Sequence, residues 1–131
     1  MSNQSLWDQH NVTDHIRNIL NSLPIDQAYN SGRPFLTTYQ IAIALEQQHP
    51  QIAAALAQAT GGEGHGPYGL TTYIARWLPD RINNRGVTDI EMRFLAPDNL
   101  TSIVLDNNGT PMTTTTNQAG YNSTMFRSIA P

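Results

Sequence analysis

The side chains with the clearest capacity for ligand chemistry lie in a glycine-rich stretch at residues 61–69. Five glycines and Pro67 surround His65 there, and Glu63 lies two residues before it. Successive backbone N–H groups could bind an anion at the start of the next helix, and His65 is placed as a catalytic base would be. The stretch lacks the preceding strand of a dinucleotide site and the Lys-Ser/Thr of a P-loop, so a flexible connection between helices is our preferred interpretation. The candidate anion-binding residues are Gly62, Gly64, His65 and Gly66.

A second group of candidates lies in residues 70–95. This segment contains four arginines and three acids, a net charge of +1, whereas the flanking regions are net negative. Arginine can bind guanine or phosphate through two N–H groups, and threonine can contact base edges or backbone. These side chains, on one predicted helix and, for Arg93, on the strand after it, could therefore bind DNA, or bind a partner protein. The alternative is a solvated helix whose arginines stabilise its C-terminal carbonyls. The candidate residues are Thr71, Thr72, Arg76, Arg81, Asn83, Arg85 and Arg93.

Other site chemistry has little support in the sequence. Without cysteine or lysine, the chain has no thiolate metal site, no cysteine nucleophile and no Schiff-base lysine. The histidines have no partner four residues away, and no serine lies in a Gly-x-Ser-x-Gly motif. We expect no metal, no cofactor and no catalytic residue. The four histidines are His10, His15, His49 and His65.

The composition of the chain limits the class of protein to which these candidate residues belong. The chain has 131 residues, 39% of them hydrophobic and 13% charged, with a net charge of −3. The seven cations, all arginine, are outnumbered by ten acids, which excludes a strongly basic nucleic-acid coat. No apolar run is long enough for a membrane span, and the first residues do not resemble a signal peptide, so we expect a cytoplasmic protein with no membrane partner.

Helices are predicted for the first two thirds of the chain. Apolar spacing indicates a helix over residues 12–22, and Thr37 with Gln40 has the spacing of a capping box at the start of a second. Pro50 suits the first position of a third helix. A fourth should resume at Leu70 or Thr71, with a kink or break at Pro79 because proline cannot donate the helical hydrogen bond.

The last third changes to strand patterns. Residues 90–94 alternate in hydrophobicity, and we expect 100–105 to return beside them as a hairpin. Asp106-Asn107-Asn108-Gly109 is a second turn signal, after which residues 113–116 could add an edge strand. Residues 117–131 are predicted to be a polar tail, with a few apolar side chains that could dock on the body or on a partner.

Helix, helix, helix and then a hairpin is the element order of the winged helix-turn-helix superfamily, which the chain resembles over residues 12–106. Phe35–Ala42 is similar to the second helix of such domains. Leu70–Leu78 would be the recognition helix, and Ile90–Leu105 would be the wing. The resemblance implies an α+β, mainly helical fold, with about four helices before a C-terminal antiparallel hairpin or three short strands. It also implies one domain at residues 1–116. The long separation at residues 49–69 departs from the short turn of the motif.

The function predicted from these features is binding without catalysis, with double-stranded DNA favoured as the ligand of a small regulator. The first alternative is a protein-binding inhibitor, adaptor, or immunity or anti-defence accessory protein, which suits a small, acidic, lysine-free domain. The second is a small enzyme or ligand-binding domain that uses the glycine-rich loop. The sequence leaves the oligomeric state open, a dimer included.

Overall fold

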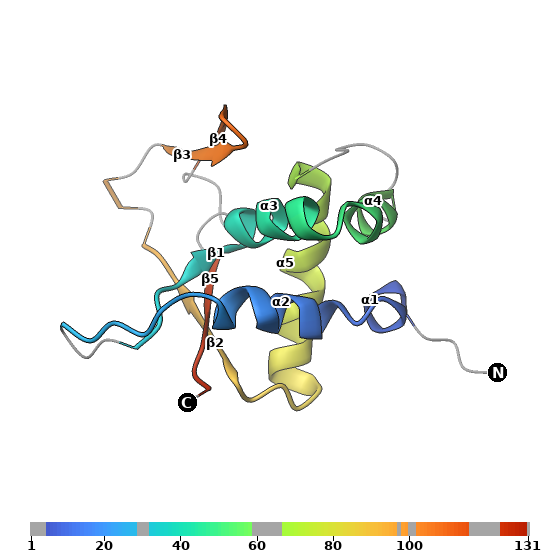
Figure 1. Cartoon of the computed structure of the whole chain (residues 1–131), viewed down its shortest axis with the longest axis horizontal. Coiled ribbons are helices and arrows are strands. Elements are labelled where there is room, and N and C mark those ends of the chain that lie inside the picture. Colours follow the sequence, from blue (N-terminus) through green and yellow to red (C-terminus); the bar gives the residue numbers. More distant parts are fainter. Residues whose placement is uncertain are drawn as a thin grey trace.

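Helices dominate the first two thirds of the chain and strands the last third, so the described residues form an α+β fold (Figure 1). The computed structural model describes residues 5–28, 32–58, 67–96, 98–99, 102–115 and 124–130. Five helices are described where the sequence predicts about four, and all the described strand pairs are antiparallel. The helices are α1 (Leu6–Gln9), α2 (Val12–Asn21), α3 (Thr38–Gln48), α4 (Pro50–Gln58) and α5 (Pro67–Asn84).

The first predicted helix is confirmed as α2, and a separate turn of helix, α1, precedes it. Ser5 caps α1, its hydroxyl accepting a hydrogen bond of 3.2 Å from the Asp8 N–H. Asn11 then adopts a left-handed φ of 53°, which separates the two helices. The indole N–H of buried Trp7 donates to the Thr13 hydroxyl at 2.7 Å, which ties α1 to α2.

The predicted capping box at the start of α3 is confirmed. The Gln40 N–H donates to the Thr37 hydroxyl at 3.2 Å, and the Thr37 N–H donates to the Gln40 side-chain oxygen at 2.7 Å. Leu36 lies before the cap and packs against the same core as fully buried Ile41, as the staple pattern predicts. This cap sets where α3 leaves the sheet.

We predict that Thr37→Ala destabilises the fold by about 1 kcal/mol, because one N-terminal N–H of α3 loses its partner. Chemical denaturation, fitted with the same m value for both proteins, would measure the change in the free energy of unfolding. Thr37→Ser is the matched control: it keeps the hydroxyl and should stay within about 0.5 kcal/mol of the parent. Equal stability of the alanine and serine variants would contradict the capping role.

Helix α5 differs from its prediction at two places. It begins at Pro67 instead of Leu70 or Thr71, because proline at a first helical position sacrifices no hydrogen bond. It also continues as one helix through Pro79 to Asn84, so of the expected kink or break the break is wrong. Buried side chains on both sides of Pro79 hold the two halves against the core, so tertiary packing outweighs the lost bond.

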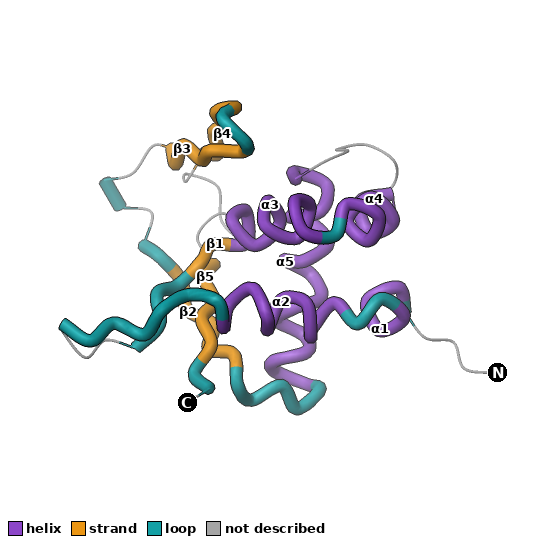
Figure 2. The backbone as a smooth tube through the Cα atoms, viewed as in Figure 1, coloured by secondary structure: helices purple, strands orange, loops and turns teal. Residues whose placement is uncertain are grey.

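A three-stranded sheet closes one end of the helices (Figure 2). Its strands are β1 (Leu36–Thr37), β2 (Ile90–Phe94) and β5 (Thr124–Ser128), in the order β1-β5-β2. Phe126 of the central strand pairs with Leu36 on one side and Met92 on the other. The expected hairpin between residues 90–94 and 100–105 is therefore wrong, since the partner of β2 comes from near the C-terminus.

Residues 102–115 form a separate hairpin of β3 (Ser102–Asn107) and β4 (Thr110–Thr115). The turn predicted at residues 106–109 is confirmed: Asn108 and Gly109 have φ of 54° and 85°, and the Gly109 N–H donates to the Asp106 carboxylate at 2.7 Å. This two-residue turn pairs neighbouring segments, so β3 closes on β4 and leaves β2 to another partner.

Part of the segment expected to be a polar tail lies in the interior. Residues 124–128 form the middle strand, and Phe126 is fully buried in the main core with residues of the helices and β2. Thr124 and Ser128 flank it on the same buried face, so two of the three inward positions are polar and the strand pattern was hidden. A smaller cluster of Ile43, Leu105 and Met112 packs the hairpin on α3.

Candidate functional site

The exposed face of α5 is the part of the predicted site that the structure leaves accessible. Thr72, Arg76 and Asn83 are exposed, and their spacing of four and seven residues places them on one side of the helix. Among the described residues, Arg76 has no hydrogen-bond or ion-pair partner. Helix α5 runs behind α3 in Figure 1 and packs against α3 and α4, so the side of α5 away from these three residues faces the core.

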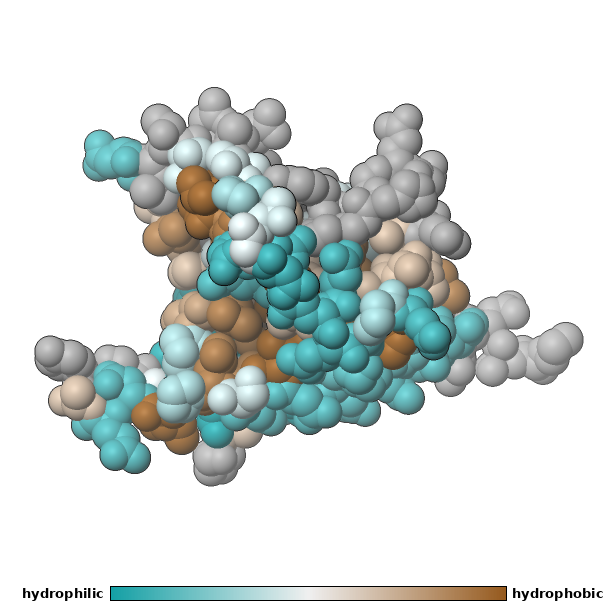
Figure 3. All heavy atoms as spheres, turned by 45° about the horizontal axis from the view of Figure 1, so that its top comes forward, coloured by the Kyte–Doolittle hydropathy of each residue, from teal (hydrophilic) through white to brown (hydrophobic). Residues whose placement is uncertain are grey.

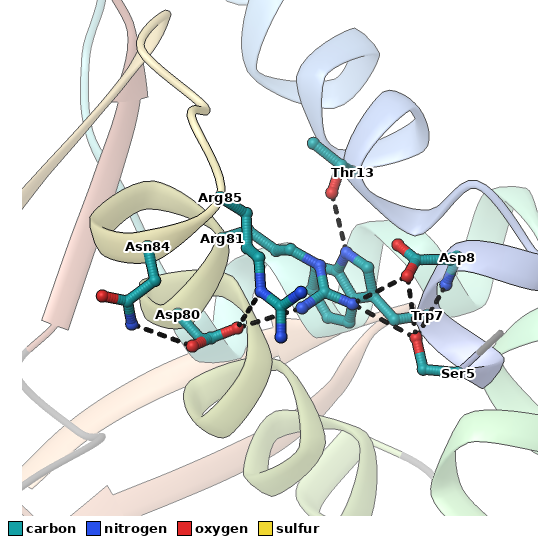
Figure 4. Close-up of polar contacts among 8 residues, drawn as sticks. All are labelled: Ser5, Trp7, Asp8, Thr13, Asp80, Arg81, Asn84 and Arg85. Carbon is teal, nitrogen blue, oxygen red and sulfur yellow. Dashed lines mark hydrogen bonds and ion pairs between the residues drawn. The ribbon is translucent and has the colours of Figure 1, made fainter. Parts of the chain in front are cut away.

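Thr71 and Arg81 lie on that core side and are only 2% and 5% exposed. The Arg81 guanidinium donates to the Asp8 carboxylate at 3.1 Å, to the Ser5 hydroxyl at 3.2 Å and to the Asp80 carboxylate at 3.0 Å (Figure 4). It also lies 5.1 Å from the Trp77 ring centre. Both buried side chains therefore leave the set that could contact a ligand, and Arg81 instead joins α1 to α5.

Arg85 and Arg93 are both 63% exposed at the side chain, and each pairs with a carboxylate. Arg85 lies 3.4 Å from Asp80, and Arg93 lies 2.9 Å from Glu91. A hydrogen bond from Asn84 is the main cause that lowers the pKa of Asp80, with the neighbouring arginines adding to it. Exposed ion pairs of this kind contribute little, so both arginines can exchange their partner for a phosphate.

The candidate anion-binding residues Gly62, Gly64, His65 and Gly66 lie outside the described residues, as does Glu63. Their predicted role stays a prediction. Within the part of the chain that the structure describes, no group of three or more metal-ligating side chains comes together. No described helix is long and apolar enough to cross a membrane.

A contact that sequence spacing does not reveal joins His15 of α2 to His49, the residue between α3 and α4. Their ring centres are 4.0 Å apart and their planes are inclined by 42°, so the two imidazoles are in tilted contact. Burial lowers the pKa of His15, and the nearby His49 lowers it further, while Asp14 acts in the opposite direction. The lowered pKa of His15 makes this junction sensitive to acid.

We predict that stability falls as the pH is lowered from about 7 to about 5, through the protonation of His15. The pKa of His15 is lower in the folded chain than its unfolded value of about 6.5, so the unfolded chain takes up the proton first. The stabilisation is complete above about pH 6.5 and is lost below it. Denaturation midpoints across this range would show the slope, and His15→Gln should flatten it.

The carboxylates affect stability at a lower pH than His15 does, so the two contributions can be told apart. Hydrogen bonds from Arg17 lower the pKa of Asp89, one of them 3.1 Å long, so this contribution is present above about pH 3.9 and is lost as the pH falls through the depressed value. A His15→Gln variant with the parent slope between pH 7 and 5 would show that the pair does not govern acid sensitivity. The same Arg17 contact ties α2 to the segment before β2.

Of the predicted contact residues that the structure describes, Thr72, Arg76 and Asn83 form an exposed polar stripe on α5, and Arg85 and Arg93 are exposed cations nearby in the sequence. No protein-family model, no curated protein and no solved structure matches this chain.

Proposed function

We propose that the chain is a non-catalytic DNA-binding regulator of the winged helix-turn-helix kind, with α5 as its recognition helix. The observation that carries the proposal is the stripe of Thr72, Arg76 and Asn83 on the solvent side of α5, where Arg76 has no partner among the described residues. A helix that packs across its neighbour and presents such side chains suits the major groove of B-form DNA.

The order of the elements supports this proposal. Helix α2, strand β1, helices α3 and α5, and strand β2 follow one another, and β5 completes the sheet between β1 and β2. The β3–β4 hairpin, inserted between β2 and β5, is then the wing. Helix α4 is the insertion that separates the two helices of the motif.

The charges determine what kind of binding this face can support. Only Arg76, Arg85 and Arg93 are exposed in the proposed surface, and two of them must first leave a carboxylate. Phosphate neutralisation by three arginines gives weak non-specific affinity. Discrimination must therefore come from base contacts, for which the fork of Arg76 suits guanine.

We predict that Arg76→Ala weakens binding to a selected duplex by about 1–3 kcal/mol. The duplex would be obtained by selection from a randomised library with the parent chain, and affinity measured by fluorescence anisotropy. Arg76→Lys is the matched variant, because it keeps the charge and loses the fork: it should retain binding to random DNA and lose preference for the selected sequence. Unchanged affinity and preference in both variants would contradict the assignment of α5.

A protein ligand is the second candidate, and the surface of the hairpin favours it. Residues 102–115 contain no cation, and Val104 of β3 is 66% exposed. Phe94 at the end of β2 is 68% exposed. Figure 3 shows apolar atoms gathered on the side of the molecule that carries the hairpin and the sheet. Exposed apolar side chains beside a groove of about 410 Å³ between α3 and β3 suit a protein partner.

A further inference from the structure

A groove of about 480 Å³ lies between the connection that follows α2 and strand β5, away from the exposed stripe of α5. Its walls are mostly apolar, formed by Pro24 and Ile25 on the connection and by Pro34 and Phe35 before β1. A volume of this size is typical of small-molecule sites, which combine apolar walls with a few polar groups that fix orientation. The polar groups of this groove therefore determine which ligand chemistry it favours.

Arg33 is the polar group that selects it. Its Nε donates to the Leu23 carbonyl at 3.2 Å and one terminal nitrogen donates to the Ala130 carbonyl at 2.6 Å, so two distant segments hold the guanidinium in place. No carboxylate of the described residues forms an ion pair with it. Carbonyl oxygens orient the half-buried cation without neutralising it, so an anion in the groove would be stabilised.

Arg127 forms part of the wall and already has a counter-charge. It donates to Glu91 at 2.6 Å and lies 4.6 Å from the centre of the Phe35 ring. Gly32 permits this close approach: its φ is 81°, and a Cβ at this position would lie 3.3 Å from the Arg127 guanidinium. The charge of Arg127 is thus balanced by Glu91. Arg33 is the cation of the lining to which an anionic ligand would bind.

Asp26 limits the number of negative charges that the groove can accept. Its carboxylate belongs to the lining and accepts a hydrogen bond of 3.0 Å from the Ala28 N–H. A ligand with a second carboxylate would meet this like charge. We propose that the groove binds a small monocarboxylate with an apolar or aromatic body, its carboxylate on Arg33 and its body against Ile25 and Phe35.

The first test is titration of the folded chain with 3-phenylpropionate, followed by amide chemical shifts in NMR. We expect saturable binding, with shifts centred on residues 24–35 and 127. The neutral analogue 3-phenylpropanamide should bind at least about tenfold more weakly, because the charge-assisted hydrogen bonds are lost. Equal affinity for the acid and the amide, or shifts centred elsewhere, would overturn the proposal.

Variants of two residues assign the contact. Arg33→Gln should weaken binding of the acid by about tenfold or more, and Arg33→Lys, which keeps the charge, should restore part of it. Ile25 is 46% exposed, so Ile25→Glu and Ile25→Gln should both fold even if Arg33→Gln does not. Both variants lose the apolar contact of Ile25, and only the glutamate adds repulsion, so the glutamate variant should bind the acid at least about tenfold more weakly than the glutamine variant. Equal affinities of the two variants for the acid would contradict a charge-selected site. No DNA enters the experiment, so its outcome is independent of the proposed function.

Discussion

Phe126→Ala is expected to destabilise the fold by about 3–5 kcal/mol, the usual cost of truncating a buried phenylalanine. The side chain is fully buried in the main core. Its strand is also the one that joins the other two, since Phe126 pairs with both Leu36 and Met92. The cavity would therefore open where the sheet meets the helices.

Urea denaturation of the purified variant would measure this loss. Ile129→Ala is the matched control from the same segment: Ile129 is 52% exposed, and its truncation should change stability by less than about 0.5 kcal/mol. If Phe126→Ala were as mild as the control, residues 124–128 would be a peripheral tail, and the sheet order would be wrong.

Arg81→Ala is expected to cost about 2–3 kcal/mol, through lost charge-assisted hydrogen bonds and lost packing of the side-chain stem on Trp77. The cost stays below that of a fully buried ion pair, because the Asp8 and Asp80 side chains are 51% and 33% exposed and regain water. The contact joins residues 73 positions apart, so α1 should loosen from α5.

Arg85→Ala is the matched control for Arg81→Ala. Arg85 pairs with the same Asp80 but is 63% exposed, so its removal should stay within about 0.5 kcal/mol. Thermal and urea unfolding of both variants give the comparison. Equal, small losses would show that the buried network is unnecessary for stability, and would return Arg81 to the set of candidate ligand contacts.

Local signals predicted the parts of the fold that local physics determines. The Thr37 cap and the Asn108-Gly109 turn need only neighbouring residues, and the structure has both. The partner of β2 could not be found in this way, because Glu91 and Arg127 of the paired strands lie 36 positions apart. The nearby segment 100–105 has a strand pattern that suits β2 equally well. It is excluded as the partner because β3 pairs with β4 through the turn between them.

Some of the predicted contact residues are exposed and others are buried, for a related reason. The predicted recognition face rests on residue type, and Thr71 and Thr72 are the same residue type. Neighbouring helical positions are about 100° apart, and in the structure Thr71 is buried whereas Thr72 is exposed. Helical spacing from Ile74 and Leu78 could have placed Thr71 and Arg81 inside, since positions three and four residues apart share a face. The Asp8 partner of Arg81 depends on the tertiary fold, and no spacing rule predicts it.

The central claim, that the α5 face binds DNA through few phosphate contacts, is tested most directly by a salt titration of the parent chain on random duplex DNA. With Arg76, Arg85 and Arg93 as the exposed cations, the logarithm of the binding constant should fall with the logarithm of salt concentration with a slope of about −2 to −3. Micromolar protein that binds no duplex at low salt would contradict the claim and favour a protein ligand. A slope steeper than about −5 would contradict the assignment of the surface.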